Sequence, residues 1–150
     1  MKKTLNKAIV LLSAAARTTT ATSNSFSVPP GVVAVTFLTD QNTVTGTSPT
    51  LDISIEVSPD NSTWFGVARF TQQTAASERF QTLHFIGSES LSQTHSTNLL
   101  GSEGAEVAAT GGVSNALIMC PPPYIRAIAT IGGTNPSFNG ALYAWFSGNF

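Results

Sequence analysis

A pattern that occurs twice constrains the fold more than any other feature of this chain. Residues 43–51 read TVTGTSPTL and residues 130–138 read TIGGTNPSF, with the matching glycines 87 positions apart. Gly46 can adopt a positive φ without steric cost. Pro49 fixes its own φ and should push Ser48 toward extended geometry. We therefore expect each copy to be a turn that starts a strand, and the two strands to be paired about a pseudo-two-fold axis.

The segment after the first copy is predicted to be one strand of a β-hairpin. From Leu51 to Val57 apolar residues alternate with polar ones, which is typical of a half-buried antiparallel strand. Ser58–Thr63 then combines a proline that presets φ with an Asp-Asn pair, and Asn61 tolerates the left-handed region. The return strand is expected over Trp64–Thr71. This hairpin is the most clearly encoded element of the chain.

The remaining segments predict more strands and no helix. Strands are expected over residues 32–38, 79–86, 116–120, 124–130 and 138–146, and residues 17–27 are expected to be a polar strand or an extended connection. Residues 87–115 contain few apolar side chains and predict one long inserted loop, which in a compact domain is usually functional or disordered. The fold class is therefore all-β: a single β-sandwich domain over residues 1–150, with about eight strands. The pattern does not separate a jelly-roll from an Ig-like order.

The N-terminal residues allow two interpretations. A basic start, a short apolar run and an Ala-x-Ala exit are typical of a secretory signal peptide. The alternative is an extended N-terminal arm over residues 1–20 that contains the first strand at Ala8–Leu12, and this is the interpretation that we expect. The apolar run is far shorter than the roughly 20 residues needed to span a bilayer, so no membrane partner is predicted.

Composition limits the partners of the chain. Charged residues make up 10% of the sequence, against roughly 25% in ordinary soluble domains. A surface made largely of Ser, Thr, Asn and Gln suits a protein outside the cell or one held in an assembly. The net charge is −1, so no basic field favours nucleic acid. The single cysteine, Cys120, excludes an intrachain disulfide and favours folding in a reducing compartment.

Residue chemistry predicts neither an enzyme nor a cofactor or metal site. His84 and His95 are far from each other, from Cys120 and from carboxylates at metal-ligand spacing. Asp52 and Glu56 share a strand face but stand roughly 13 Å apart at the usual strand rise, whereas glycosidase pairs need about 5–9.5 Å. Nucleophile-elbow, zinc-protease, P-loop and dinucleotide motifs are absent from the sequence.

Four aromatic residues and one sequon leave an alternative open. Trp64, Tyr124, Tyr143 and Trp145 could form a sugar-stacking platform, as in carbohydrate-binding or adhesion modules, but aromatics of this kind more often fill cores and corners. The sequon at Asn61 is better interpreted as turn chemistry than as a glycosylation site.

Three stretches together resemble a family of small virion proteins from tailed bacteriophages. They are LLSAAART at 11–18, GTSPTLDISIEVSPDNSTW at 46–64 and PYIRAIATIGGTNPSF at 123–138. The resemblance implies a β-sandwich structural protein of the particle, of the capsid decoration or cement type. It implies the major capsid protein as partner, a homo-oligomer such as a trimer, and a virion location after assembly in the host cytoplasm. A tail, neck or fibre component is the alternative within the same family.

The expected contact residues lie in the segments outside the repeat. The N-terminal arm, the long loop and the last residue are predicted to contact neighbouring subunits. The residues proposed for this role are Lys2, Lys3, Leu5, Lys7, Leu91, His95, Leu99, Leu100 and Phe150.

Overall fold

The regular structure of the chain consists of β-strands. The computed structural model describes residues 7–85, 107–108, 113–118 and 122–148. Within these ranges it contains nine strands and no helix, so the predicted all-β class is confirmed. The strands are β1 Lys7–Arg17, β2 Ala21–Thr22, β3 Phe26–Ser27, β4 Val32–Ser58, β5 Phe65–Arg69, β6 Ser77–Phe85, β7 Val107–Ala108, β8 Val113–Ile118 and β9 Tyr124–Gly148.

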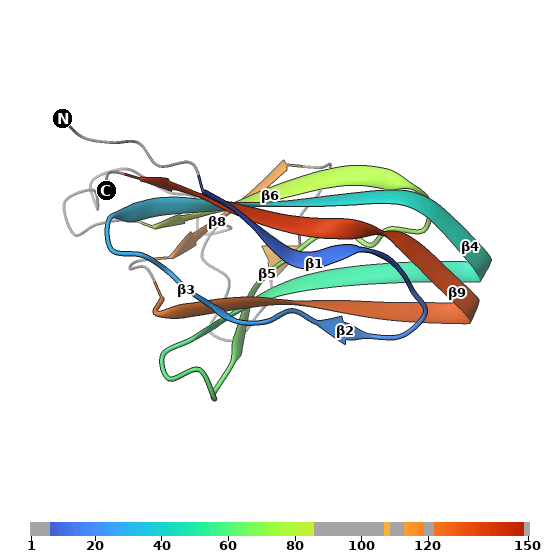
Figure 1. Ribbon diagram of the computed structural model, residues 1–150, viewed down its shortest axis with the longest axis horizontal. Coiled ribbons are helices and arrows are strands. Elements are labelled where there is room, and N and C mark those ends of the chain that lie inside the picture. Colours follow the sequence, from blue (N-terminus) through green and yellow to red (C-terminus); the bar gives the residue numbers. More distant parts are fainter. Residues whose placement is uncertain (1–6, 86–106, 109–112, 119–121, 149–150) are drawn as a thin grey trace.

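Two long strands form the centre of the molecule. β4 has 27 residues and β9 has 25, and they pair antiparallel from one end to the other. Figure 1 shows both strands bending sharply at the same point and running back beneath themselves. The two copies of the repeat lie at this bend and pair with each other, with Val44 opposite Phe138 and Leu51 opposite Ile131. In the repeat, Ile131 corresponds to Val44 and Phe138 corresponds to Leu51. Exchanging the two copies therefore turns one of these pairs into the other, so the pairing has the predicted pseudo-two-fold symmetry.

The backbone angles at the bend repeat in the two copies. Gly46 has a φ of 113° and Gly133 a φ of 111°, as the pattern predicts for the first glycine. Ser48 and Asn135 have φ values of 49° and 48°. The prediction that Ser48 is extended is therefore wrong, and neither copy is a turn that starts a strand. The ladder continues on both sides of the bend, so each strand must change direction within a few residues, and two left-handed residues per strand provide that change.

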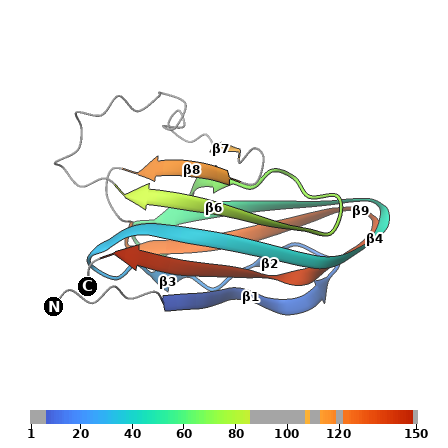
Figure 2. The ribbon, with the colours of Figure 1, turned by 90° about the horizontal axis from the view of Figure 1, so that it is seen from above.

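Because β4 and β9 fold back, one continuous sheet forms two stacked halves. The first half holds β8, β6, the start of β4, the end of β9 and β1, in that order. The second half holds β7, β5, the end of β4, the start of β9, and then β2 and β3. Figure 2 shows strands of the first half side by side. The two layers of this β-sandwich-like fold are thus parts of one continuous sheet that is bent through its middle.

The core lies between the two halves. Its fully buried side chains include Phe37, Phe146 and Leu142 from the first half and Ile53, Ile55 and Ile125 from the second. Phe26 of β3 and Phe146 of β9 meet edge to face, with ring centroids 5.4 Å apart. Each such side chain stabilises the folded state by about 1.5–3 kcal/mol relative to exposure. The regular alternation of Leu51–Val57 arises because its apolar side chains all point into this core.

The predicted hairpin is confirmed, and one carboxylate organises its turn. β4 and β5 pair antiparallel, and Asn61 has a φ of 60°. The Asp60 carboxylate accepts hydrogen bonds from the backbone N–H of Thr63 at 2.7 Å and of Ser62 at 2.9 Å. The Ser58 hydroxyl also donates to it at 3.0 Å. These donors, Thr63 first, hold the pKa of Asp60 well below its usual range.

Strand pairing refines two predicted segments. Within the N-terminal arm expected over 1–20, the strand expected over Ala8–Leu12 is confirmed as part of β1, which is longer, Lys7–Arg17, and pairs with the end of β9. The long loop over 87–115 is wrong where β7 and the start of β8 lie within it. β8 pairs with β6 in parallel and overlaps the strand expected over 116–120, but it begins three residues earlier. Residues 1–6, 86–106 and 109–112 lie outside the described part.

Candidate protein-interaction surface

A line of apolar side chains crosses the outer face of the first half. Residues directly opposite each other in a sheet share a face. Tyr143 lies opposite both Val10 and Leu38, and Leu38 lies opposite Phe80, so these four residues form one row from β1 to β6. Val10 is 58% exposed and Phe80 is 42% exposed, while the two central members are half-buried. We call this set the apolar row.

The neighbouring residues confirm which way the apolar row faces. The hydroxyl oxygens of Thr36 and Thr82 lie 3.1 Å apart on the same outer side. The residues that alternate with the row, such as Phe37 and Gln81, are completely buried on the inner side. The row therefore lies outside the core and covers nothing within the described part of the chain. Exposed apolar groups gathered on one sheet face are typical of protein contacts.

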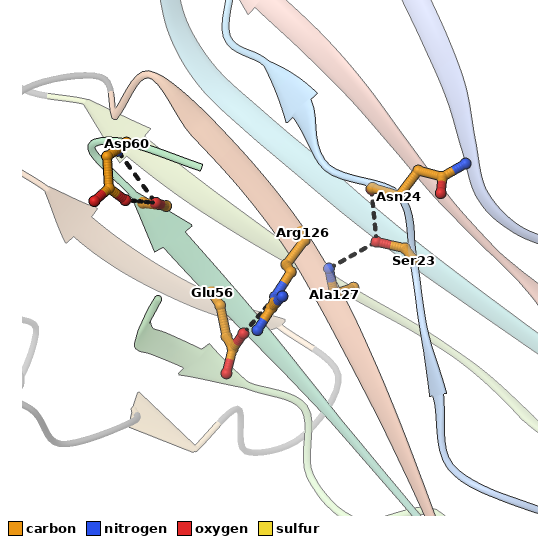
Figure 3. Close-up of polar contacts among 7 residues, drawn as sticks. Ser23, Asn24, Glu56, Asp60, Arg126 and Ala127 are labelled. Carbon is orange, nitrogen blue, oxygen red and sulfur yellow. Dashed lines mark hydrogen bonds and ion pairs between the residues drawn. The ribbon is translucent and has the colours of Figure 1, made fainter. Parts of the chain in front are cut away.

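The outer face of the second half is polar and contains one ion pair. The Arg126 Nε donates to a Glu56 carboxylate oxygen at 2.7 Å, as Figure 3 shows. The guanidinium carbon of Arg126 also lies 4.1 Å from the ring centroid of Trp64. Gln72 donates to the carboxylate of Asp52 at 2.9 Å. The two predicted strand carboxylates thus have different partners and do not act as a pair.

The four aromatics proposed as a sugar platform lie on opposite sides of the molecule. Tyr124 lies on the outer face of the second half, opposite Ser58, and Trp64 packs on Arg126 there. Tyr143 and Trp145 lie on the outer face of the first half. No single platform can include all four, and one face of the Trp64 ring is covered by the guanidinium.

Sequence reasoning missed several buried polar side chains. Gln41, Gln73 and Gln81 are at most 6% exposed, and Gln41 donates to Thr39 at 2.9 Å. Six buried polar atoms in the described part have no partner, and five residues contribute them: Gln41, Thr71, Gln73, Arg79 and Gln81. An unpaired buried group costs about 1–3 kcal/mol. The alternation of apolar and polar residues did not indicate that these side chains are buried, because glutamine is ordinarily an outward-facing residue.

One small cavity lies inside the described part of the molecule. It has a volume of about 10 Å³ and lies between the halves near the bend, lined by side chains that include Leu12, Arg17, Gln41 and Phe138. That volume holds at most one water molecule. Ser23 closes the sheet edge nearby, since its N–H donates to the carbonyl of Ala127 and its hydroxyl accepts from the Ala127 N–H, both at 2.9 Å.

Almost all of the predicted contact residues lie outside the described part. Lys7 is the exception, because it begins β1 opposite Phe146. The others, outside the described residues, are Lys2, Lys3, Leu5, Leu91, His95, Leu99, Leu100 and Phe150. Their roles stay predictions. Of the two histidines, His84 is placed in β6, with its backbone opposite Ala34 and Leu117.

The described residues contain neither a metal-ligand cluster nor a helix that could span a membrane. Within residues 7–85, 107–108, 113–118 and 122–148, no three His, Cys, Asp or Glu side chains gather as metal ligands. The same residues include no helix of the length and apolarity needed to cross a membrane. No family model, no curated protein and no solved structure matches the chain. Any function must therefore be argued from the surface geometry and the sequence motifs.

Proposed function

We propose that this chain is a non-enzymatic structural protein of a tailed-bacteriophage particle, of the capsid decoration or cement type. In this role it binds between subunits of the major capsid protein and stabilises the shell. The proposal starts from the ordered set of motifs that resembles such virion proteins. Its support in the structure is the apolar row, an exposed apolar strip on a protein with few charges.

The place of the resembling motifs fits a scaffold role. The antiparallel pair of β4 and β9 is the central ribbon of the molecule. The stretches at 46–64 and 123–138 contribute much of this central ribbon, its bend and the β4–β5 hairpin. They hold the two halves together, which leaves the outer faces available for contacts. A scaffold of this kind specifies a shape and surface rather than a reaction.

Stabilisation of a shell follows from ordinary linkage. A protein that binds the assembled shell, and does not bind free subunits, shifts the disassembly equilibrium by RT ln(1 + [L]/Kd). At a free concentration one hundred times Kd this amounts to about 2.7 kcal/mol for each site. No catalytic group is required.

The test compares shells that carry the protein with shells that lack it. Heat or chelator treatment should release the genome at a lower temperature, or at a lower chelator concentration, from shells without the protein. Adding purified protein back should restore the resistance. Equal resistance with and without the protein, and no copies on the shell, would contradict the cement assignment.

Copy number separates the alternatives within the virion. Hundreds of copies per particle support the shell position, whereas a dozen or fewer assign the protein to the tail, neck or a fibre. A glycan array tests the carbohydrate-binding alternative. The geometry gives that alternative little support, because its four aromatics lie on opposite faces.

A further inference from the structure

The apolar row has two acidic residues beside it that face each other. Asp40 of β4 lies directly opposite Glu78 of β6, and each acid is two residues nearer the bend than Leu38 or Phe80, so both share the outer face with the row. Asp40 is half-buried and Glu78 is exposed. Like charges that stand directly opposite each other on neighbouring strands destabilise a sheet. The acids therefore weaken the sheet at a point where an apolar surface is also exposed.

The described arginines are all placed away from these acids. Arg126 pairs with Glu56, and Arg17 donates to backbone carbonyls. Arg79 belongs to the inner side of β6 and Arg69 to the outer face of the second half, as their strand partners show. The ion pair of Glu56 and Arg126 is the only one among the described residues, so neither acid has a cationic partner there. A cation for the two acids must come from outside the described part of the chain.

The outer face of the second half has the opposite arrangement. Its acids have partners, since Glu56 binds Arg126 and Asp52 accepts a hydrogen bond from Gln72. The first half combines exposed apolar side chains with acids that nothing in the described part neutralises. Departures from the local rules of stability are expected at functional sites. The outer face of the first half is therefore the face that a partner is expected to cover.

We propose that the apolar row and the Asp40–Glu78 pair bind one partner surface, an apolar strip of a capsid subunit with a lysine or arginine beside it. The apolar strip covers Val10 and Phe80, and the cation lies between the two carboxylates. A second copy fits less well, because its first half brings two more acids and, among the described residues, no cation. The inference rests on the proposed function, since it names the partner's side of the same contact.

The stability of the free chain tests whether the acids are unpaired. Without a cation nearby, Glu78→Gln removes a repulsion between opposed charges. The melting temperature of the purified full chain at low salt should therefore stay the same or rise. A melting temperature that falls by several degrees would show that the chain itself supplies a cation to Glu78, and it would overturn the inference.

Binding to shells that lack the protein tests the contact itself. Shells are sedimented with increasing concentrations of the full chain, and the bound fraction gives the dissociation constant. Glu78→Lys should raise that constant at least about tenfold, and Phe80→Ser should raise it by a similar factor. Asp52→Lys makes the same change of charge on the opposite face, and this control should bind as the wild type does. Added salt should weaken binding of the wild type, but it should have little effect on the double variant Asp40→Asn, Glu78→Gln.

The remaining outcomes separate this inference from the proposed function. If the wild type binds shells and the variants at Glu78 and Phe80 bind equally well, the inference fails and the shell role stands. If Asp52→Lys loses as much affinity as Glu78→Lys, the first half is not the binding face and the inference also fails. If shells do not bind the wild type, both proposals fail.

Self-association is measured by sedimentation velocity of the free chain at about 100 μM, a concentration that detects micromolar affinity. The wild type should be monomeric. Association that Phe80→Ser abolishes would assign the apolar row to a second copy and overturn the inference. Far-ultraviolet circular dichroism of every variant verifies that the fold is intact.

Discussion

Gly133 should be among the least replaceable residues of the chain, although its neighbour Gly132 should be replaceable. Gly133 has a φ of 111°, and a Cβ added there would lie 2.6 Å from the carbonyl oxygen of Ser48 and 3.0 Å from the Cα of Pro49. Both atoms are backbone and belong to the facing strand. A side chain in such a backbone conformation costs about 1–3 kcal/mol. Overpacking against fixed atoms adds about 1–3 kcal/mol, so Gly133→Ala should lose about 2–6 kcal/mol.

Gly132→Ala is the matched control, one residue away on the same strand. A Cβ there would meet the Thr50 hydroxyl at 2.7 Å, and that side chain can rotate away. Gly132 has no positive φ, so the backbone accepts alanine and the unfolded chain loses entropy. We expect a change in the free energy of unfolding within about 1 kcal/mol of zero.

Urea unfolding followed by tryptophan fluorescence measures both variants. Trp64 and Trp145 are the two tryptophans and lie in different halves, so their signals report both layers. The stability of a typical domain is about 5–15 kcal/mol, so the expected loss is a large part of the total. The unfolding midpoint should fall with little change in m-value. If Gly133→Ala lies within about 0.5 kcal/mol of wild type, or if both alanines cost the same, the bend is not as tight as described.

Three further outcomes follow from other local features. Ser48→Asn should raise the free energy of unfolding by up to about 1 kcal/mol, because asparagine tolerates the left-handed backbone that Asn135 adopts in the other copy; a urea titration measures it, and a loss would contradict the account of the bend. Folding lowers the pKa of Asp60, so its stabilising contribution is present above its unfolded pKa, near 3.9, and is lost as pH falls through its lower folded pKa. The melting temperatures of wild type and Asp60→Asn should therefore converge as pH falls below about 4. Parallel plots of melting temperature against pH for the two proteins would refute this. A double-mutant cycle with Glu56→Gln and Arg126→Met should give a coupling of about 0.2–1 kcal/mol that shrinks when salt is added, because the pair is partly exposed; a coupling that does not respond to salt would show that the contact is mainly packing.

Local chemistry allowed a large part of the fold to be predicted. The alternation at Leu51–Val57 and the Asp-Asn turn at Ser58–Thr63 produced the observed hairpin, because both depend on neighbours in sequence. The match between 43–51 and 130–138 indicated paired strands, and those segments do pair.

Features that depend on distant partners escaped the sequence. Pro49 indicated a break before a new strand, yet the ladder continues through the bend, because the facing strand bends in the same way. The burial of Gln81 is set by its place on β6, opposite the buried Phe37, and a polar residue gives no sign of it. The apolar row likewise needs four strands in register, since each of its four members comes from a different part of the chain.

The central ribbon also determines where the chain can change in length. Among the residues that pair between β4 and β9, Ser58 and Tyr124 are nearest in sequence, 66 positions apart. The whole of β5 to β8 lies between them in the chain. The entropy lost when a loop is closed grows only with the logarithm of its length, by about 0.6 kcal/mol for each doubling. The pairing of β4 with β9 already closes this loop, so insertions between β6 and β8 add very little to the entropy cost of closing it. A lineage could lengthen, shorten or exchange that segment while the bend and its two glycines keep the scaffold unchanged.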